Sequence, residues 1–307
     1  MKVFHPNLFI PGAGKSGTSS LHQLLGLHPK ICMSKTKEPH FWTRLDYNQF
    51  TAKEHQQYAS LFDDKTDAKY YGESSTGYMV FPNFIKRIKA KYESEPKFIF
   101  ILRNPIDRCY SHYWWLKGIG SEKNNLRTAF LKDKETEPTP EVQLPETNYK
   151  CYYQYGLYAK WLEKFYMNFD TKNIKVICYE SLKTKPLETI NDCFHFLSLE
   201  PLDEVPEIHT NKTLILKAPY LYRFTKLLVY NKVRLPQFVK DSTPNKVKEF
   251  LRKHLSKTVL KYTKTGKTYP EINAEDRLFF KQHYKEDIIK LRQLTGLNFS
   301  EWNDFNG

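Results

Sequence analysis

At 307 residues, 40% of them hydrophobic and 15% aromatic, the chain can bury a full core, and this composition excludes an intrinsically disordered protein. It has no apolar run near the roughly 20 residues needed to cross a bilayer, and its first residues, MKVFHPNLFIPG, lack the apolar stretch of a signal peptide, so we expect a cytoplasmic protein. The formal net charge is +14, and 211–270 alone carries 15 Lys and Arg against two acids, which is consistent with either a polyanionic partner or a solvated basic face.

The first hundred residues alternate between strand and helix patterns. A short apolar strand over 8–11 is followed by a loop of small residues and then by a helix with Leu21, Leu24 and Leu25 on one face. The next expected elements, in chain order, are a strand over 31–34, a loop over 35–42, a helix over 51–62, a strand and polar turn over 70–78, and a basic helix over 82–92.

The second part of the chain opens with its clearest buried strand, KFIFILR at 97–103, after which Asn104 and Pro105 start a helix as N-cap and first residue. Polar, proline-containing residues 119–147 predict an irregular excursion. The later expected elements are a helix with an aromatic face over 152–166, a strand over 173–180, a helix over 186–197 and an amphipathic helix over 276–296 that ends at Gly296.

This alternation predicts an α/β fold, a P-loop-like three-layer sandwich whose central, mainly parallel sheet is flanked by helices, as one domain over 1–307. Ligands of such sheets bind beyond the carboxyl ends of the strands, so the loops after 8–11 and 97–103 should share one cleft. The cysteines are scattered without CxxC spacing, which predicts reduced core thiols and neither a disulfide framework nor a zinc site. They are Cys32, Cys109, Cys151, Cys178 and Cys193.

The loop PGAGKSGTSS, 11–20, has the composition of an anion site. Glycines let backbone N–H groups approach an anion, the helix that follows adds partial positive charge, and Lys15 adds a full charge. The kinase pattern G-x-x-x-x-G-K-S/T would need a glycine at position 9, where this chain has Phe9 inside the strand, and no strand ends in an obvious magnesium-binding aspartate. A kinase or NTPase remains the alternative interpretation.

A second pattern fits this loop better. Lys15-Ser16-Gly17-Thr18-Ser19 resembles the 5′-phosphosulfate loop of PAPS-dependent sulfotransferases, where PAPS is 3′-phosphoadenylyl sulfate. Four further segments resemble that family in the family's own order, and the resemblance runs from about Asn7 to Trp302. They are Lys37-Glu38-Pro39-His40-Phe41-Trp42, similar to Lys-Glu-x-x-Phe-Phe of the heparan-sulfate-type enzymes; Gly72–Tyr78, similar to Glu-Lys-Ser-x-x-Tyr; Arg103–Ser111, similar to the 3′-phosphate segment; and Thr265–Pro270, similar to Lys-Gly-Arg-x-Tyr-Pro.

The resemblance implies the following roles. Glu38 would be the general base, Lys15 would stabilise the leaving phosphate, and Lys37 would help to orient the sulfuryl group. Arg103 and Ser111 would bind the 3′-phosphate, and no metal is implied. The full set of expected cofactor-binding residues is Gly14, Lys15, Ser16, Gly17, Thr18, Ser19, Arg103, Ser111, Lys264, Thr265, Gly266, Lys267 and Tyr269.

Two points depart from this pattern or compete with it. In the late loop Thr265 and Lys267 replace the family's lysine and arginine, and Lys264 could supply the missing charge. His40 and His112 are rival bases, because small-molecule sulfotransferases use a histidine. Tyr269 either stacks on adenine or packs in the core.

The resemblance also implies an acceptor class and a second possible compartment. The expected acceptor is a hydroxyl, less readily an amine, of a carbohydrate, glycolipid or other small molecule, and Trp114 and Trp115 either line a sugar site or pack in the core. Golgi relatives carry a membrane anchor, so the Golgi lumen is the alternative if an anchor has been removed. We expect no nucleic-acid partner, although a polyanion-binding protein that uses 211–270 is the alternative from another class.

Overall fold

The computed structural model describes residues 4–63, 67–136, 150–207 and 268–306. Its centre is a five-stranded sheet in the order β2-β3-β1-β4-β5, and every printed pairing between neighbouring strands is parallel. The strands are β1 (Leu8–Ile10), β2 (Ile31–Met33), β3 (Tyr70–Ser74), β4 (Lys97–Leu102) and β5 (Ile174–Cys178). The expected parallel α/β sheet is therefore confirmed.

Alternation of side chains along the strands divides the interior into two cores. In β1, Leu8 and Ile10 join one buried cluster while Phe9 joins the other, because successive side chains of a strand point to opposite faces. In β4, Ile99 and Ile101 face the first cluster, and Phe98 joins Phe9 in the second. A parallel sheet buried on both faces needs such continuous apolar runs.

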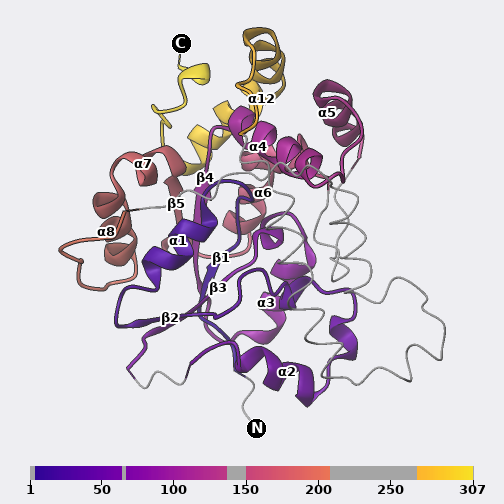
Figure 1. Ribbon diagram of the computed structural model, residues 1–307. Helices are drawn as coiled ribbons and strands as arrows, with labels where there is room; N and C mark the ends of the chain where they lie inside the picture. The colour runs from indigo at the N-terminus through magenta and orange to yellow at the C-terminus, as the bar shows by residue number, and fades with distance from the viewer. Residues whose placement is uncertain (1–3, 64–66, 137–149, 208–267, 307) are drawn as a thin grey trace, which may run out of the picture.

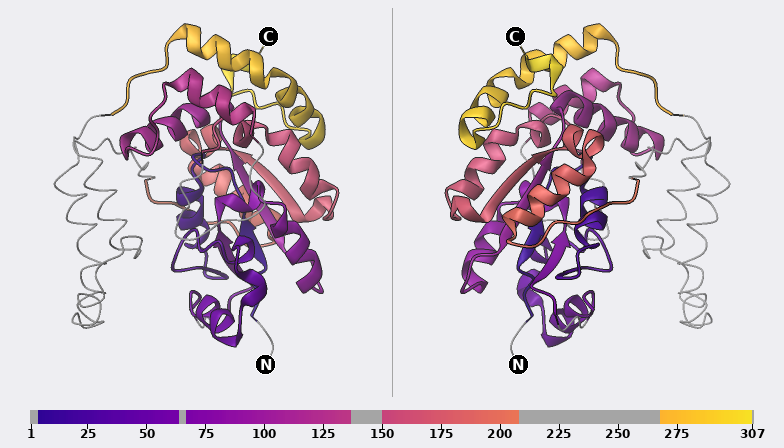
Figure 2. Two further views of the ribbon diagram at one scale, coloured as in Figure 1. Left: turned by 90° about the vertical axis from the view of Figure 1, so that its right-hand side faces the viewer. Right: turned by 90° about the vertical axis from the view of Figure 1, so that its left-hand side faces the viewer.

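Helices cover both faces of this sheet. Three helices lie together on one side of the sheet, as Figure 1 shows: α1 (Thr18–Leu25), α7 (Tyr179–Thr184) and α8 (Pro186–Phe196). They contribute to the buried cluster that contains Leu8 and Ile10. The helices on the opposite face contribute to the second buried cluster, which contains Phe9 and Phe98 and many other aromatic residues. Of these helices, α12 lies at the end of the molecule away from the N-terminus (Figure 2). These helices are α3 (Asn83–Lys91), α4 (Pro105–Gly118), α6 (Tyr158–Tyr166) and α12 (Ala274–Thr295).

Helix termini largely follow the capping residues of the sequence. Asn104 accepts a hydrogen bond from the backbone N–H of Ile106 and starts α4, as expected. Thr51 forms a capping box with Glu54 at the start of α2 (Ala52–Ala59). At the other end of the chain, Gly296 takes a left-handed conformation and ends α12.

Three expected segments differ from the structure in their bounds or content. The excursion over 119–147 contains a helix, α5 (Leu126–Lys134), which buries Phe130 and whose apolar face is obscured in sequence by charged neighbours. The helix expected over 152–166 begins only at Tyr158, because Gly156 turns the chain close against the Tyr284 ring, 2.6 Å from where a Cβ would lie. The strand expected over 173–180 ends at Cys178, and α7 follows at once.

The single domain expected over 1–307 includes 208–267, which lies outside the described residues, so it stays a prediction. The basic segment 211–270 is likewise described only from residue 268 onward. All five cysteines are free thiols, and four of them are buried, in agreement with the expected core thiols.

Candidate active site

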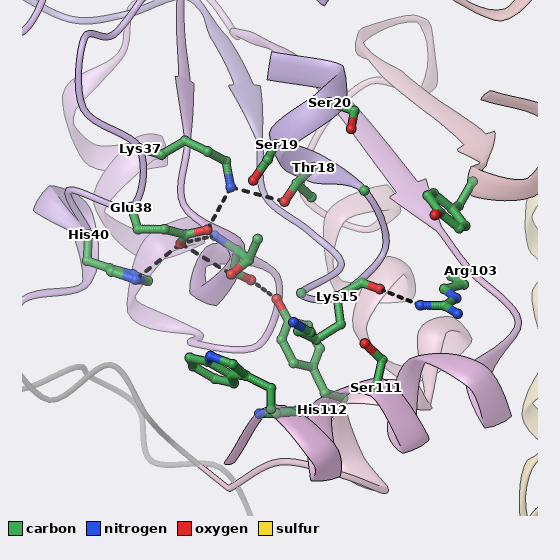
Figure 3. Close-up of a pocket in the computed structure, with 16 residues that line it drawn as sticks. Lys15, Thr18, Ser19, Ser20, Lys37, Glu38, His40, Arg103, Ser111 and His112 are labelled. Carbon is green, nitrogen blue, oxygen red and sulfur yellow. Dashed lines mark hydrogen bonds and ion pairs between the residues drawn. The ribbon is translucent and has the colours of Figure 1, made fainter. Parts of the chain in front are cut away.

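A cavity of about 420 Å³ lies beyond the carboxyl ends of the strands, and the segment after each of the five strands contributes to its wall. The loops after the 8–11 and 97–103 strands therefore share one cleft, as expected. Figure 3 shows Glu38 and His40 on one side of this cavity, Arg103 on the other, and Lys15 between them. The lining residues are Gly14, Lys15, Gly17, Thr18, Ser19, Ser20, Lys37, Glu38, His40, Thr76, Arg103, Ser111, His112, Trp115, Tyr155 and Tyr179.

The loop between β1 and α1 presents a tight turn to the cavity. Gly17 has φ 88°, and a Cβ there would lie 2.5 Å from the Tyr179 ring, so both the backbone conformation and the close approach require glycine. Ser16 is placed differently from its neighbours: its side chain is fully buried away from the cavity lining, and its N–H donates to Ala13 O at 3.2 Å. Among the expected loop residues 14–19, Ser16 is thus the one that does not line the cavity.

Lys15 is a partly buried cation beside other cations. Burial is the main cause that lowers the pKa of Lys15 to about 8, and the charges of Arg103 and Arg108 lower it further. Among the described residues, no carboxylate lies within ion-pair distance of Lys15 or Arg103, while Lys15 Nζ lies 5.3 Å from the centre of the Trp115 ring. Unbalanced positive charge of this kind favours a bound anion.

Glu38 is held in place through both of its carboxylate oxygens. Oε1 lies 3.0 Å from Lys37 Nζ, and Oε2 accepts from the Thr76 backbone N–H at 2.8 Å and lies 3.2 Å from His40 Nε2. Burial opposes ionisation, but Lys37 and then His40 overcome it and lower the pKa of Glu38 to about 2. The carboxylate is therefore ionised at neutral pH and still reaches the cavity.

Both rival histidines also line the cavity, but in different settings. His40 is buried and its Nε2 lies against a Glu38 carboxylate oxygen, so it can orient that carboxylate. His112 lies on α4, where its Nδ1 is 3.3 Å from Nη1 of the buried Arg108. Because a guanidinium only donates, that ring nitrogen is the acceptor.

Arg103 and Ser111 meet at the same end of the cavity. Arg103 directly follows β4, and its guanidinium lies 5.2 Å from the Tyr179 ring and 3.5 Å from Lys15 O. Ser111 reaches the cavity only because α4 packs across the cleft, which is the condition that its position in the helix imposes. Arg103 and Ser111, eight residues apart in sequence, therefore both line one cavity.

The late loop is only partly described. Residues 264–267 lie outside the described residues, so the expected contacts of Lys264, Thr265, Gly266 and Lys267 stay predictions. Tyr269 stacks on Trp114, with ring centres 6.1 Å apart and planes 8° apart, and Pro270 O accepts from Tyr110. Of the two tryptophans, Trp115 lines the cavity, whereas Trp114 packs with Tyr269.

Four lining residues were not singled out from the sequence: Ser20, Thr76, Tyr155 and Tyr179. Thr76 and Tyr179 had a usable signal, because each stands just after a strand whose carboxyl end faces the cleft. Tyr155 had no local signal, since it reaches the cavity from a turn before α6, where its hydroxyl donates to Thr76 O. In the described parts of the chain, no group of His, Cys, Asp or Glu is placed to hold a metal ion.

A parallel sheet with a glycine loop and helix after its central strand, and with cations around one cavity, places this protein in the P-loop-like α/β class. A family model described as "Sulfotransferase domain" matches residues 5–292, and the chain belongs to the sulfotransferase family. It is therefore a member of a family of enzymes that transfer a sulfuryl group.

Curated relatives with similar sequences are carbohydrate-directed sulfotransferases by name. Mouse heparan sulfate glucosamine 3-O-sulfotransferase 5 is 27% identical over 86% of this chain and 73% of its own length. Mouse carbohydrate sulfotransferase 15 is 26% identical over 68% of this chain, which spans just under half (46%) of that relative's length. A crystal structure of a sulfotransferase from Alicyclobacillus acidocaldarius has the same fold, with a TM-score of 0.65 at 24% identity over 98% of this chain and all of that one.

No helix in the described part of the chain combines the length and the apolar character needed to cross a bilayer. The cytoplasmic compartment, and the Golgi lumen as its alternative, stay predictions.

Proposed function

We propose that this sulfotransferase uses PAPS as donor and transfers the sulfuryl group to a hydroxyl, less readily an amine, of a carbohydrate or glycolipid. The observation that carries the donor proposal is the placement of three cations, Lys15, Lys37 and Arg103, around one cavity that contains a single carboxylate, Glu38, among its described lining residues. PAPS has a 3′-phosphate and a 5′-phosphosulfate, so two separate anionic groups match the two ends of this cationic wall.

The described residues fit such a donor in both charge and shape. Ser111 and Arg103 would hold the 3′-phosphate, while Lys15, Thr18 and the N–H groups at the start of α1 would hold the 5′-phosphosulfate. Gly17 packs so close to the Tyr179 ring that the loop has no room for a Cβ at this point. When bound, PAPS supplies an activated sulfuryl group whose departure leaves negative charge on a phosphate, and Lys15 is placed to stabilise that charge.

Glu38 would receive the proton from the acceptor hydroxyl. A carboxylate with a pKa of about 2 is a weak base, but Lys37 touches Thr18 as well as Glu38. An anion held at Thr18 attracts Lys37, which weakens its hold on Glu38 and raises the pKa of that carboxyl. His40 remains hydrogen-bonded to the carboxylate and keeps it oriented.

The acceptor class rests on the names of the relatives and on two aromatic rings that line the cavity. The names of the similar curated enzymes refer to heparan sulfate glucosamine and to carbohydrate. Trp115 and His112, one turn apart on α4, offer an aromatic surface against which the apolar face of a sugar ring can pack. A kinase or NTPase and a polyanion-binding protein that uses 211–270 are the competing functions.

One experiment separates these functions. PAP, the product of PAPS, should raise the melting temperature of the protein, whereas ATP with magnesium should raise it much less. Transfer of labelled sulfate from PAPS to a set of neutral glycosides, glycolipids and heparan-type glycans then tests the acceptor class. A melting temperature that responds to ATP with magnesium but not to PAP would favour the kinase; salt-sensitive binding of nucleic acid with no response to PAP would favour the polyanion-binding protein.

A further inference from the structure

Glu73 is a fully buried carboxylate directly beneath the loop that carries Glu38 and His40. It lies near the carboxyl end of β3 and has no exposed surface. Three hydroxyl groups donate to it: Ser75 Oγ at 2.5 Å from Oε1, Tyr78 Oη at 3.1 Å from Oε2, and the Tyr58 hydroxyl, also to Oε2. The roles assigned above to the cavity residues do not use this group.

The same three hydroxyls also hold the loop after β2. The backbone N–H of His40 donates to Ser75 Oγ at 3.0 Å, and the backbone N–H of Trp42 donates to Tyr78 Oη at 3.3 Å. The indole N–H of Trp42 donates to Tyr58 Oη at 3.2 Å. Each hydroxyl therefore stands between the Glu73 carboxylate and one N–H group of the loop.

A hydroxyl carries only one proton, so the acceptor of that proton decides which way the group points. Because the Glu73 carboxylate accepts all three protons, the lone pairs of Ser75, Tyr58 and Tyr78 are left to accept from the loop. Glu73 thus determines where the protons of these three hydroxyls point. A group at position 73 that itself donates would leave at least one of these hydroxyl protons without its acceptor, so that hydroxyl would have to turn toward another acceptor and shift away from the loop N–H that it holds.

The loop needs such support, because its backbone is in a sparsely populated conformation. Glu38 has φ 58° and His40 has φ 49°, both in the left-handed region that residues with a Cβ seldom occupy. The loop is fastened to β3 by the Glu38 N–H, which donates to Ser74 O at 2.8 Å, and by the hydroxyls above. This conformation brings His40 Nε2 to within 3.2 Å of Glu38 Oε2.

We propose that Glu73 is a positioning residue for sulfuryl transfer: as a carboxylate it orients the Ser75, Tyr58 and Tyr78 hydroxyls, and through them it holds Glu38 and His40 in their working geometry. This proposal rests on the proposed role of Glu38 as the base. Glu73 is buried away from the cavity lining, so its effect passes through the hydroxyls and His40.

The protonation state of Glu73 gives the proposal a second readout. Burial raises the pKa of Glu73 to about 7, against the lowering effect of the three hydroxyl donors. The titratable groups that face it are Tyr58 from α2, Tyr78 after β3, Tyr92 after α3 and His40 from the loop. A protonated Glu73 is itself a donor and disturbs the hydroxyls, so turnover should fall as the pH drops below about 7.

The test compares Glu73→Gln with Glu122→Gln, which changes another buried, hydrogen-bonded carboxylate outside the cavity. Both variants are studied with PAPS and the glycoside that gives the highest turnover with the wild-type enzyme. For E73Q we expect kcat to fall at least tenfold at pH 8, the acceptor KM and the PAP dissociation constant to stay within about threefold, and the wild-type loss of kcat below pH 7 to disappear. E122Q should keep both kcat and the wild-type pH profile.

Equal kcat values and equal pH profiles for E73Q and E122Q would overturn the proposal. If E73Q does not fold, as judged by circular dichroism, Ser75→Ala removes only the hydroxyl between Glu73 and His40; an unchanged kcat in S75A would overturn the proposal as well. Failure of the proposed function has a different signature, because PAP would then bind neither the wild type nor the variants in calorimetry.

Discussion

The ammonium group of Lys37 lies 3.1 Å from the hydroxyl of Thr18, so the loop after β2 touches the first turn of α1. The same Nζ atom lies 3.0 Å from Glu38 Oε1. One cation thus connects the candidate base to the loop that would hold the donor, as Figure 3 shows. In the proposed function, an anion bound at Thr18 would compete with the carboxylate of Glu38 for Lys37, which would couple donor binding to the strength of the base.

Replacement of Glu38 by glutamine should remove the base and keep the shape of the site. We expect kcat to fall by about 10²- to 10⁴-fold, the range typical of a general base, while PAP still binds within a few-fold of the wild type. Steady-state kinetics and calorimetry measure the two effects separately. Glu188→Gln, the same change at an exposed position of α8, serves as control. Full turnover in an E38Q enzyme that binds PAP normally would refute the role of Glu38.

Replacement of Lys15 by methionine should weaken donor binding. A hydrogen bond to a charged group contributes about 1.5–3 kcal/mol, which corresponds to roughly 10- to 100-fold in the dissociation constant of PAP. Calorimetric titration with PAP measures this change, and Lys132→Met on α5 provides a control on a helix away from the cavity lining. Unaltered PAP affinity and rate in K15M would contradict the proposed anion site.

Binding of PAP should take up protons at mildly alkaline pH. The pKa of Lys15 is lowered to about 8 in the free protein, so a part of its ammonium is deprotonated at pH 8 and above. A bound phosphate favours the charged form and raises that pKa again, and affinity should consequently decline as the pH rises above 8. Calorimetry in two buffers of different ionisation enthalpy reports the proton uptake, which K15M should lose. Equal uptake in wild type and K15M would exclude Lys15 as its source.

Substitution of Trp115 tests the acceptor wall. Trp115→Ala should raise the KM for a glycoside acceptor about tenfold, whereas Trp115→Phe, which keeps an aromatic face, should stay within about threefold of the wild type. Lys15 Nζ lies 5.3 Å from the centre of the indole ring, and a cation–π contact contributes about 0.5–1 kcal/mol, so affinity for PAP should change by no more than a few-fold. If W115A and W115F have the same KM as the wild type, the acceptor does not pack on this residue.

The buried carboxyl of Glu73 should make folding stability depend on pH. Its pKa is raised from an ordinary value of 4.5 to about 7 in the folded protein, so the folded state binds this proton more tightly than the unfolded state. This contribution to stability is complete below pH 4.5 and is lost as the pH rises through 7. Urea unfolding from pH 5 to 8 should show a decline for the wild type that is smaller in E73Q. Parallel curves for the two proteins would contradict the raised pKa.

Local patterns were sufficient for much of the fold and for part of the site. The apolar run over 97–103 and the Asn104-Pro105 start of α4 were both readable, because strand burial and helix capping depend on neighbouring residues. Lys15 and Arg103 were placed correctly in one cleft for the related reason that carboxyl ends of parallel strands meet at one edge. Gly17 could likewise be assigned to the predicted anion-binding loop from the residues next to it.

Other features depend on contacts between distant segments. No pattern around 152–156 indicates that Tyr155 reaches the cavity, since its place is set by packing of Gly156 against Tyr284. The helix α5 could not be predicted from its own residues because only a few of them are buried. The segments that cover those residues are distant in sequence, so the local pattern does not indicate them. Ser16 lies in the matched motif, yet the turn of the loop buries it.

The amino-acid sequence by itself determined the class of fold, the family and the cationic loop, because hydrophobic period, capping residues and short motifs are properties of contiguous residues. Only the tertiary structure decided how the base is held. Glu38, His40 and Glu73 come from two separate segments, and the hydroxyls that join them are oriented by a buried carboxylate. Directed hydrogen bonds of this kind require each donor and acceptor to be placed within a few tenths of an ångström, and the packing of the whole domain sets those positions.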